Sequence, residues 1–303
     1  MTTDIVSIQT SSNQKIIKKR RRLNLDWLGA LPLLAPTGIW FFFLLVLPTL
    51  IILELSFVKD IKPGDIVQPN GFDNYIRILD PVYLEIIKNS VLLAAGTTLI
   101  CLILALPTAY WIAQKVPKRW QNFLLLSIIL PFWTSSLLRS YAWITILRPT
   151  GLLNTVLSYL DLPSLEILNT IYAVLIGMSY SLLPYMVLIL YASLEKLDKR
   201  LLEAAADLGA SPIVAFWKVT VPQALTGIIA GCFLVFITAL GDYINPQLLG
   251  GASSMTITRL IYNQFLGLTE NWGFGSALST TLILIVSVAI ALLIKFGEAE
   301  PKK

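Results

Sequence analysis

The stretch TIYAVLIGMSYSLLPYMVLILYASL, residues 170–194, decides the fold class of this 303-residue chain. It carries no charged side chain, and it is longer than the roughly 20 residues a helix needs to cross about 30 Å of hydrocarbon. Helices are expected because unpaired backbone groups are not tolerated in lipid. Further apolar segments of spanning length lie at residues 28–57, 89–114, 123–147, 224–245 and 274–296. The sequence therefore predicts an all-α membrane protein with six transmembrane helices.

The composition supports lipid as the surrounding solvent. Hydrophobic residues make up 56% of the chain and charged residues 14%, whereas a soluble domain has about 25% charged residues. A net charge of +5 would also suit a nucleic-acid partner. That alternative is rejected, because the basic residues separate apolar runs instead of forming a stripe on a folded domain. We expect residues 25–297 to form a membrane-embedded domain.

The basic residues also predict the orientation. Residues 1–24 combine low hydrophobicity with a basic cluster at positions 15–22 and are predicted to be a disordered cytoplasmic tail; residues 298–303 form a second cytoplasmic tail. With the amino terminus inside, most lysines and arginines are cytoplasmic, as the positive-inside rule requires. The other side then keeps only Lys59, Lys62, Arg77, Lys88, Arg139, Arg148 and Arg259. Both termini are predicted inside.

Residue types needed for most catalysis and metal binding are scarce. The chain has no histidine, which removes the commonest metal ligand and acid–base group. Cys101 and Cys232 lie far apart in apolar runs and are interpreted as small core residues. No nucleophile–base set can be recognised. We therefore expect neither a metal site nor an enzyme.

The loop after residue 194 does not resemble a linker. Residues 195–222 are EKLDKRLLEAAADLGASPIVAFWKVTVP, in which Leu201, Leu202, Ala205 and Leu208 share one helical face. Gly209 is typical of a helix end, and Ser211 followed by Pro212 is typical of the next helix start.

The second helix of this loop places Ile213, Phe216, Trp217 and Thr220 so that they face one way. Two short amphipathic helices exposed to the cytosol need a surface to pack on. A helical hairpin on lipid headgroups and a docking element for a partner's groove both satisfy that need, and the residues alone do not decide between them.

The spacing of this loop resembles a known family. Glu203-Ala204-Ala205, three residues, Gly209, nine residues and then Val219-x-Val221-Pro222 is similar to the EAA loop of binding-protein-dependent ABC permeases. The pattern of that family is Glu-Ala-Ala, three, Gly, nine, Ile-x-Leu-Pro. The two valines are conservative departures.

Other stretches extend the resemblance. Gly71-x-x-Asn74-Tyr75, leading to Asn89-Ser90, is similar to the approach to the second span in these permeases. LPFWTSSLLRSYAW at residues 130–143 and ALGDYINPQLLGG at residues 239–251 resemble the spermidine/putrescine permease subgroup.

This resemblance implies the permease subunit of an ABC importer in the bacterial inner membrane, moving a small solute, a polyamine first among the candidates, by ATP-driven alternating access. It implies a cytosolic ATP-binding subunit dimer, a second permease chain and a periplasmic solute-binding protein as partners. Glu203, Ala204, Ala205, Gly209 and Pro222 would belong to the loop that couples to the ATPase. The chain lacks a Gly-x-x-x-x-Gly-Lys-Ser/Thr motif, so ATP is expected on the partner and no cofactor on this chain.

Ionisable residues in the spans are candidates for the solute path, because each costs about 2.5–3.5 kcal/mol at the membrane centre. Asp242 is either a carboxylate that attracts a cationic solute at the outer mouth, or an interfacial carboxylate that is solvated or paired with a base such as Arg139. Arg139 also suits a helix anchor, and Glu54 lies beside the outer loop. Aromatic rings that could bind an ammonium group, or simply pack, are Trp133, Tyr141, Tyr185 and Tyr243.

Two other functions stay open at this stage. The same importer class could carry another solute, such as an anion, an iron chelate or an opine. A stand-alone channel or secondary carrier would need no ATPase at all.

Overall fold

A computed structural model describes residues 35–62, 64, 71–251, 254–267 and 270–297. The chain divides into two units, Met1–Leu50 and Ile51–Lys303. Both predicted tails, residues 1–24 and 298–303, lie outside the described residues, as does the start of the first predicted span.

The described residues are helical and contain no strand. In chain order the helices, with π and 3-10 segments marked η, are η1 Phe42–Val46, α2 Leu47–Leu55, α3 Asp73–Ile78, α4 Pro81–Tyr110, η2 Trp111–Lys115, α5 Lys118–Ile129, η3 Leu130–Trp133, α6 Ser136–Leu147, α7 Leu152–Tyr159, α8 Ile171–Leu194, α9 Lys199–Asp207, α10 Pro212–Ala215, η4 Phe216–Thr220, α11 Val221–Gln223, α12 Leu225–Gly241, α13 Ile244–Leu249, α14 Ile257–Leu266 and α15 Trp272–Gly297.

Helices of spanning length occur where the sequence predicts them. By length and composition, four helices in the described parts can each cross a membrane, and the number rises to six if each of two bent helix pairs counts as one span. The bent pairs are residues 118–159 and 212–241, with bends of 90° and 71°. The all-α, multi-span fold class is therefore confirmed.

The third predicted span, residues 123–147, is not one straight helix. The chain turns through 90° between Trp133 and Ser136, where Thr134 adopts an extended backbone. Pro131 accounts for the end of α5 at Ile129, because it has no N–H to donate to an earlier carbonyl and its ring would clash with that carbonyl. Its own carbonyl accepts the Thr134 hydroxyl at 2.7 Å and an Arg139 N–H at 3.4 Å.

The second span begins earlier than residue 89. Helix α4 starts at Pro81, directly after Asp80. Proline favours the first helical turn, because its missing N–H would be unpaired there anyway. The charged residues Glu85 and Lys88 therefore lie inside the first turns of the helix and do not precede it.

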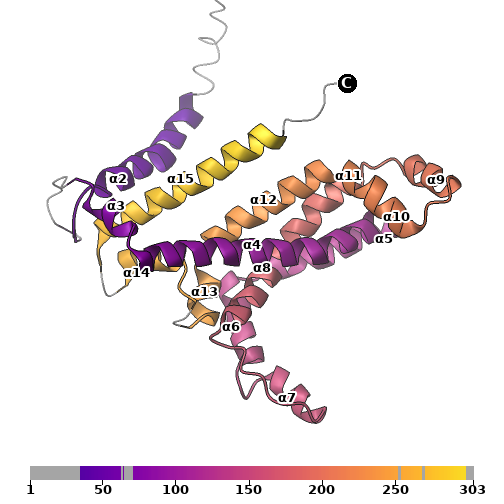
Figure 1. Cartoon of the computed structure of the whole chain (residues 1–303), viewed down its shortest axis with the longest axis horizontal. Helices are drawn as coiled ribbons and strands as arrows, with labels where there is room; N and C mark the ends of the chain where they lie inside the picture. The colour runs from indigo at the N-terminus through magenta and orange to yellow at the C-terminus, as the bar shows by residue number, and fades with distance from the viewer. Residues whose placement is uncertain (1–34, 63, 65–70, 252–253, 268–269, 298–303) are drawn as a thin grey trace, which may run out of the picture. The chain divides into compact units, whose positions relative to one another are not determined.

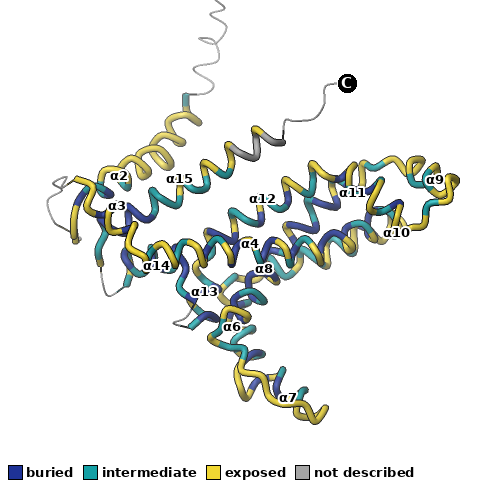
Figure 2. The backbone as a smooth tube through the Cα atoms, viewed as in Figure 1, coloured by how far each residue is buried: buried dark blue, intermediate teal, exposed yellow. Residues whose placement is uncertain are grey.

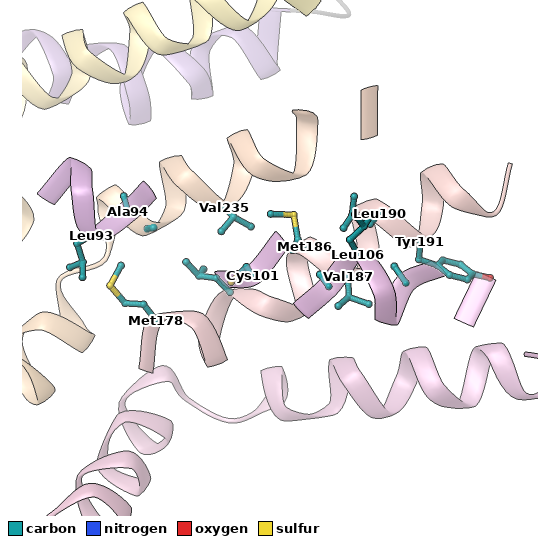
Figure 3. Close-up of a cluster of buried hydrophobic side chains, with 14 of the residues drawn as sticks. Leu93, Ala94, Cys101, Leu106, Met178, Met186, Val187, Leu190, Tyr191 and Val235 are labelled. Carbon is teal, nitrogen blue, oxygen red and sulfur yellow. The ribbon is translucent and has the colours of Figure 1, made fainter. Parts of the chain in front are cut away.

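The core of the larger unit lies where α4, α8 and α12 pack together. Figure 3 shows Cys101 and Leu106 of α4, Met186 of α8 and Val235 of α12 within one cluster. Small side chains allow close helix approach, as in membrane bundles generally. On α4 the residues with no exposed surface are Ala94, Thr97, Cys101, Ala105 and Ala109. Figure 2 shows the buried stretches of these helices in dark blue.

The two ends of α4 carry different structures. Near its beginning, a second buried cluster joins Ile78 of α3, Leu260 of α14 and Phe274 of α15. Near its other end lie α9, α10 and α11 (Figure 1). Segments 71–80 and 195–223 are thus found at opposite ends of the same helix.

Candidate functional site

Residues 195–222, called the coupling segment below, fold as the sequence predicts at its turns. The Asp198 carboxylate accepts the Arg200 N–H at 3.0 Å and caps the start of α9. Gly209 follows the end of α9 with φ of +81°, a conformation that glycine adopts without strain. The Ser211 hydroxyl accepts the Val214 N–H at 3.4 Å, and Pro212 occupies the first turn of α10.

The second half of the coupling segment has two faces. Ala215 and Thr220 are buried and Phe216 partly so, whereas Ile213 is 71% exposed and Trp217 60% exposed. The expectation that positions 213, 216, 217 and 220 all face one way is therefore wrong. The π-helical geometry of η4 changes the angular spacing from that of an α-helix, so these side chains are divided between the two faces.

The outer face of the coupling segment carries exposed apolar side chains beside charged ones such as Glu203 and Asp207. Leu208 is 89% exposed, and Glu203, Ala204 and Pro222 are also exposed, while Ala205 is half-buried. Figure 2 shows α9 largely in the exposed colour. Exposed apolar surface of this kind marks a contact with protein or lipid.

A cavity of about 280 Å³ lies among η3, α6, α8, α12 and the turn that precedes α13. Four of the candidate residues chosen from the sequence line it: Asp242, Tyr243, Arg139 and Tyr185. The other lining residues are Phe132, Ser136, Ser181, Leu182, Thr238, Gly241 and Ile244. The cavity therefore combines one acid, one base, three aromatic rings and three hydroxyl groups from serine and threonine.

The Asp242 carboxylate is held by the chain that follows it. One oxygen accepts the Ile244 N–H at 2.9 Å and the Asn245 N–H at 3.3 Å. The other accepts the Asn245 side-chain amide at 2.6 Å. The carboxylate thus accepts from N–H groups at the start of α13 that have no partner within the helix, the usual role of an aspartate before a helix.

Asn245 connects this turn to the neighbouring helices. It is 1% exposed, and its Oδ1 atom accepts the Ser140 hydroxyl of α6 at 3.1 Å. On α8, a Cβ atom placed on Gly177 would lie 2.8 Å from the same Oδ1 atom. The side chain thus joins α6 to α13 and packs directly on α8.

Arg139 reaches the same cavity from α6. Its guanidinium lies 5.1 Å from the centre of the Phe132 ring, a cation–π contact. Its Nε atom is buried and has no hydrogen-bond partner among the described residues. Within those residues Arg139 and Asp242 do not form an ion pair, so the pairing considered from the sequence is absent.

The aromatic candidates separate into two groups. Tyr185 packs edge-to-face on Phe132, with ring centres 4.7 Å apart, and Tyr243 stacks on Tyr262 at 5.0 Å. Trp133 is 86% exposed and Tyr141 55% exposed, and neither lines the cavity. Glu54 is exposed on α2 and does not line it either.

Several cavity residues escaped the sequence analysis. Ser181 and Thr238 are small polar residues inside apolar helices, which is a weak signal because such side chains bond back to their own helix, as Thr238 does to the Leu234 carbonyl at 2.7 Å. Asn245, which holds Asp242 but does not line the cavity, has a stronger sequence signal, since an Asp-x-x-Asn spacing suits a capping turn. Phe132 carries no signal apart from its neighbour Pro131.

Comparisons with known proteins agree with this architecture. Residues 36–296 match the family described as binding-protein-dependent transport system inner membrane component. A spermidine/putrescine transport system permease protein PotB from Escherichia coli (strain K12) is 41% identical, covering 87% of this chain and 96% of the relative. The protein of that name from Haemophilus influenzae is 40% identical, covering 83% and 88%.

Solved structures share the fold. One chain of a bacterial ABC transporter involved in the import of the acidic polysaccharide alginate superposes with a TM-score of 0.71 at 20% identity, covering 91% of this chain and 97% of that one. At that identity the likeness concerns the fold alone. The family match spans nearly the whole described region, and it fits the membrane-spanning helices and the apolar composition. This chain is a member of the binding-protein-dependent transport system inner membrane component family.

Proposed function

We propose that this chain is a non-catalytic permease subunit of an ATP-driven importer for polyamines such as spermidine and putrescine. The observation that carries the proposal is the 40–41% identity to PotB permeases over more than four fifths of the chain. The cavity beside Asp242 adds support, because it offers a carboxylate and aromatic rings, the two groups that attract ammonium ions.

Energy would enter through the coupling segment. Its outer face presents Leu208, Ile213 and Trp217, which suits insertion into a groove on a cytosolic ATP-binding subunit. This requires the segment and both chain termini to lie in the cytoplasm. The chain lacks a phosphate-binding loop motif, so ATP hydrolysis is assigned to that partner.

The remaining partners follow from the family. One permease chain of about six spans would supply one wall of the path, and a second permease chain the other. A periplasmic binding protein would deliver the solute; one solved relative is described as in complex with a pentasaccharide-bound periplasmic protein.

A second candidate is the same importer with a solute that carries an anionic group. Arg139 favours it, because its buried Nε donor has no partner among the described residues and its side chain lines the cavity. An unpaired donor of this kind would bind a carboxylate or a phosphate strongly.

The experiment that tests the proposal is reconstitution in lipid vesicles with the native partner subunits and the binding protein. Labelled spermidine or putrescine should accumulate only when ATP is present on the side of the ATP-binding subunit. Uptake without ATP, driven by an ion gradient through this chain alone, would establish a secondary carrier instead. ATP-driven uptake of an anion, but not of polyamines, would support the second candidate.

A further inference from the structure

The inner face of the coupling segment meets the bundle through an aromatic contact. The ring of Phe216, the first residue of η4, lies 5.0 Å from the ring of Tyr110, and the two planes are inclined at 75°. Tyr110 is the last residue of α4. Both side chains pack against the main core in the edge-to-face arrangement that aromatic pairs prefer.

π-helical turns border this contact on both sides. Segment η2 starts at the residue after Tyr110, and η4 starts with Phe216 itself. Such turns are rare and occur mostly at functional positions, because they interrupt the regular backbone ladder. In the described residues Gln114 Oε1 of η2 and Thr220 Oγ1 of η4 are buried without a hydrogen-bond partner. Side-chain bonds also reach η2: the Gln121 amide donates to the Ala113 carbonyl at 3.3 Å.

Helix α4 is built to carry a displacement away from Tyr110. It runs from Pro81 to Tyr110, with Pro107 inside its last turn, and it packs on α8 and α12. Its buried alanines and Cys101 lie in the part of these interfaces that has no exposed surface. Close-packed interiors transmit strain because they compress little. Both α8 and α12 contribute walls to the cavity that contains Asp242.

We propose that the Tyr110–Phe216 contact passes movement of the coupling segment into the transmembrane bundle, which makes both aromatic side chains positioning residues for the transport cycle. This inference rests on the proposed function in one respect, the ATP-driven movement of the coupling segment. It does not depend on the identity of the solute.

Two other connections define the competing explanations. The coupling segment continues through α11 into α12 across a 71° bend, so the backbone itself could carry the movement without Tyr110. The Gln114 side chain donates to the Leu194 carbonyl at 2.7 Å, which ties η2 to the end of α8. If the aromatic contact carries the movement, removal of a single ring will interrupt its transmission to the bundle. The other two connections do not lead to that expectation.

The test uses the chain assembled with its native partners, with Cys101 and Cys232 replaced by alanine. A reporter, Thr238→Cys, is placed in the cavity wall, where residue 238 is exposed. Its rate of reaction with a thiol reagent is measured with and without ATP plus vanadate. Tyr110→Phe is the matched control, because it keeps the ring and removes only the hydroxyl.

The reporter's response to ATP plus vanadate should be intact in the parent and in Tyr110→Phe. It should fall by roughly three- to tenfold in Tyr110→Ala and in Phe216→Ala, the range that the strength of an aromatic pair allows. The double variant should lose no more than the worse single variant, because both changes remove the same contact. Tyr110→Leu keeps apolar bulk for folding and should show the same loss.

A full response in Tyr110→Leu or Tyr110→Ala would overturn the inference. Losses that multiply in the double variant would also overturn it. So would a parent protein whose reporter reacts at the same rate with and without ATP plus vanadate. Complex yield and ATP hydrolysis, measured on the same samples, show whether each variant assembles. Polyamine uptake is recorded separately. Absent uptake beside an intact, ring-dependent reporter response would reject the polyamine assignment and support the contact.

Discussion

The Ser140 hydroxyl of α6 donates to Asn245 Oδ1 of α13 across 3.1 Å, and this bond joins two segments that are 105 residues apart in the sequence. The amide of the same Asn245 donates to the Asp242 carboxylate. The orientation of the acidic group in the cavity wall therefore depends on a side chain that does not line the cavity.

Replacement of Asn245 by alanine should release this turn. A buried hydrogen-bonded group that loses its partner costs about 1–3 kcal/mol, so the complex should unfold at a lower temperature and transport with a raised KM. Ser140→Ala removes one hydrogen bond and should have the smaller effect, near ~1 kcal/mol. Thermal unfolding of the purified complex ranks the stabilities of the parent, Ser140→Ala and Asn245→Ala. Equal stabilities for these three proteins would argue against the hydrogen bonds from Asn245 as a source of stability.

Gly177→Ala should be tolerated poorly. The added Cβ would lie 2.4 Å from Leu249 Cδ1 and 2.8 Å from Asn245 Oδ1, so α13 would have to move away from α8. Overpacking of this kind costs about 1–3 kcal/mol. Gly96→Ala on α4 is the control, since its nearest neighbour would be Leu175 Cδ2 at 3.4 Å and alanine favours a helix. If Gly96→Ala proves the more damaging variant, α13 does not pack closely on α8 at Gly177.

Gly209 should accept only residues that tolerate its backbone conformation. Its φ of +81° disfavours β-branched side chains, whereas asparagine adopts such angles more readily. Gly209→Val should therefore reduce co-purification of the ATP-binding subunit, while Gly209→Asn should retain most of it. A Cβ at this position meets no atom of this chain within 4 Å. Because asparagine and valine have similar volumes, a loss with valine that asparagine does not share reflects the backbone conformation.

Asp242→Asn separates the charge of this residue from its capping role. Asparagine also caps helices well, so its one amide oxygen should still accept the Ile244 and Asn245 N–H groups. Its NH2 group cannot accept the Asn245 side-chain amide, so that one hydrogen bond should be lost. Loss of the negative charge should raise the KM for a polyamine, with little change in the amount of assembled complex. Arg139→Gln is the companion variant. Improved or unchanged polyamine uptake by this variant fits a cationic solute. Loss of uptake in this variant would point to a solute with an anionic group.

The sequence predicts the spans and the turns of the coupling segment because their signals are local. Uncharged runs such as residues 170–194 indicate spans, and Gly209 with Ser211 and Pro212 marks helix ends. Ile213 and Phe216 lie on different faces of the coupling segment because of the π-helical turn at η4. This turn has no recognised sequence signature. The Arg139–Phe132 contact depends on the 90° turn near Pro131, and the Asn245–Ser140 bond joins distant segments. Neither of these two contacts can be predicted from a local sequence pattern.

The coupling segment gives the most direct test of the whole account. Leu208, 89% exposed, would be replaced by cysteine in a chain lacking Cys101 and Cys232, and short thiol cross-linkers applied to membranes that contain the native partners. We predict a cross-link from residue 208 to the ATP-binding subunit and protection from membrane-impermeant reagents added outside the cell. Labelling of residue 208 from outside, with no cross-link to that subunit, would contradict the account.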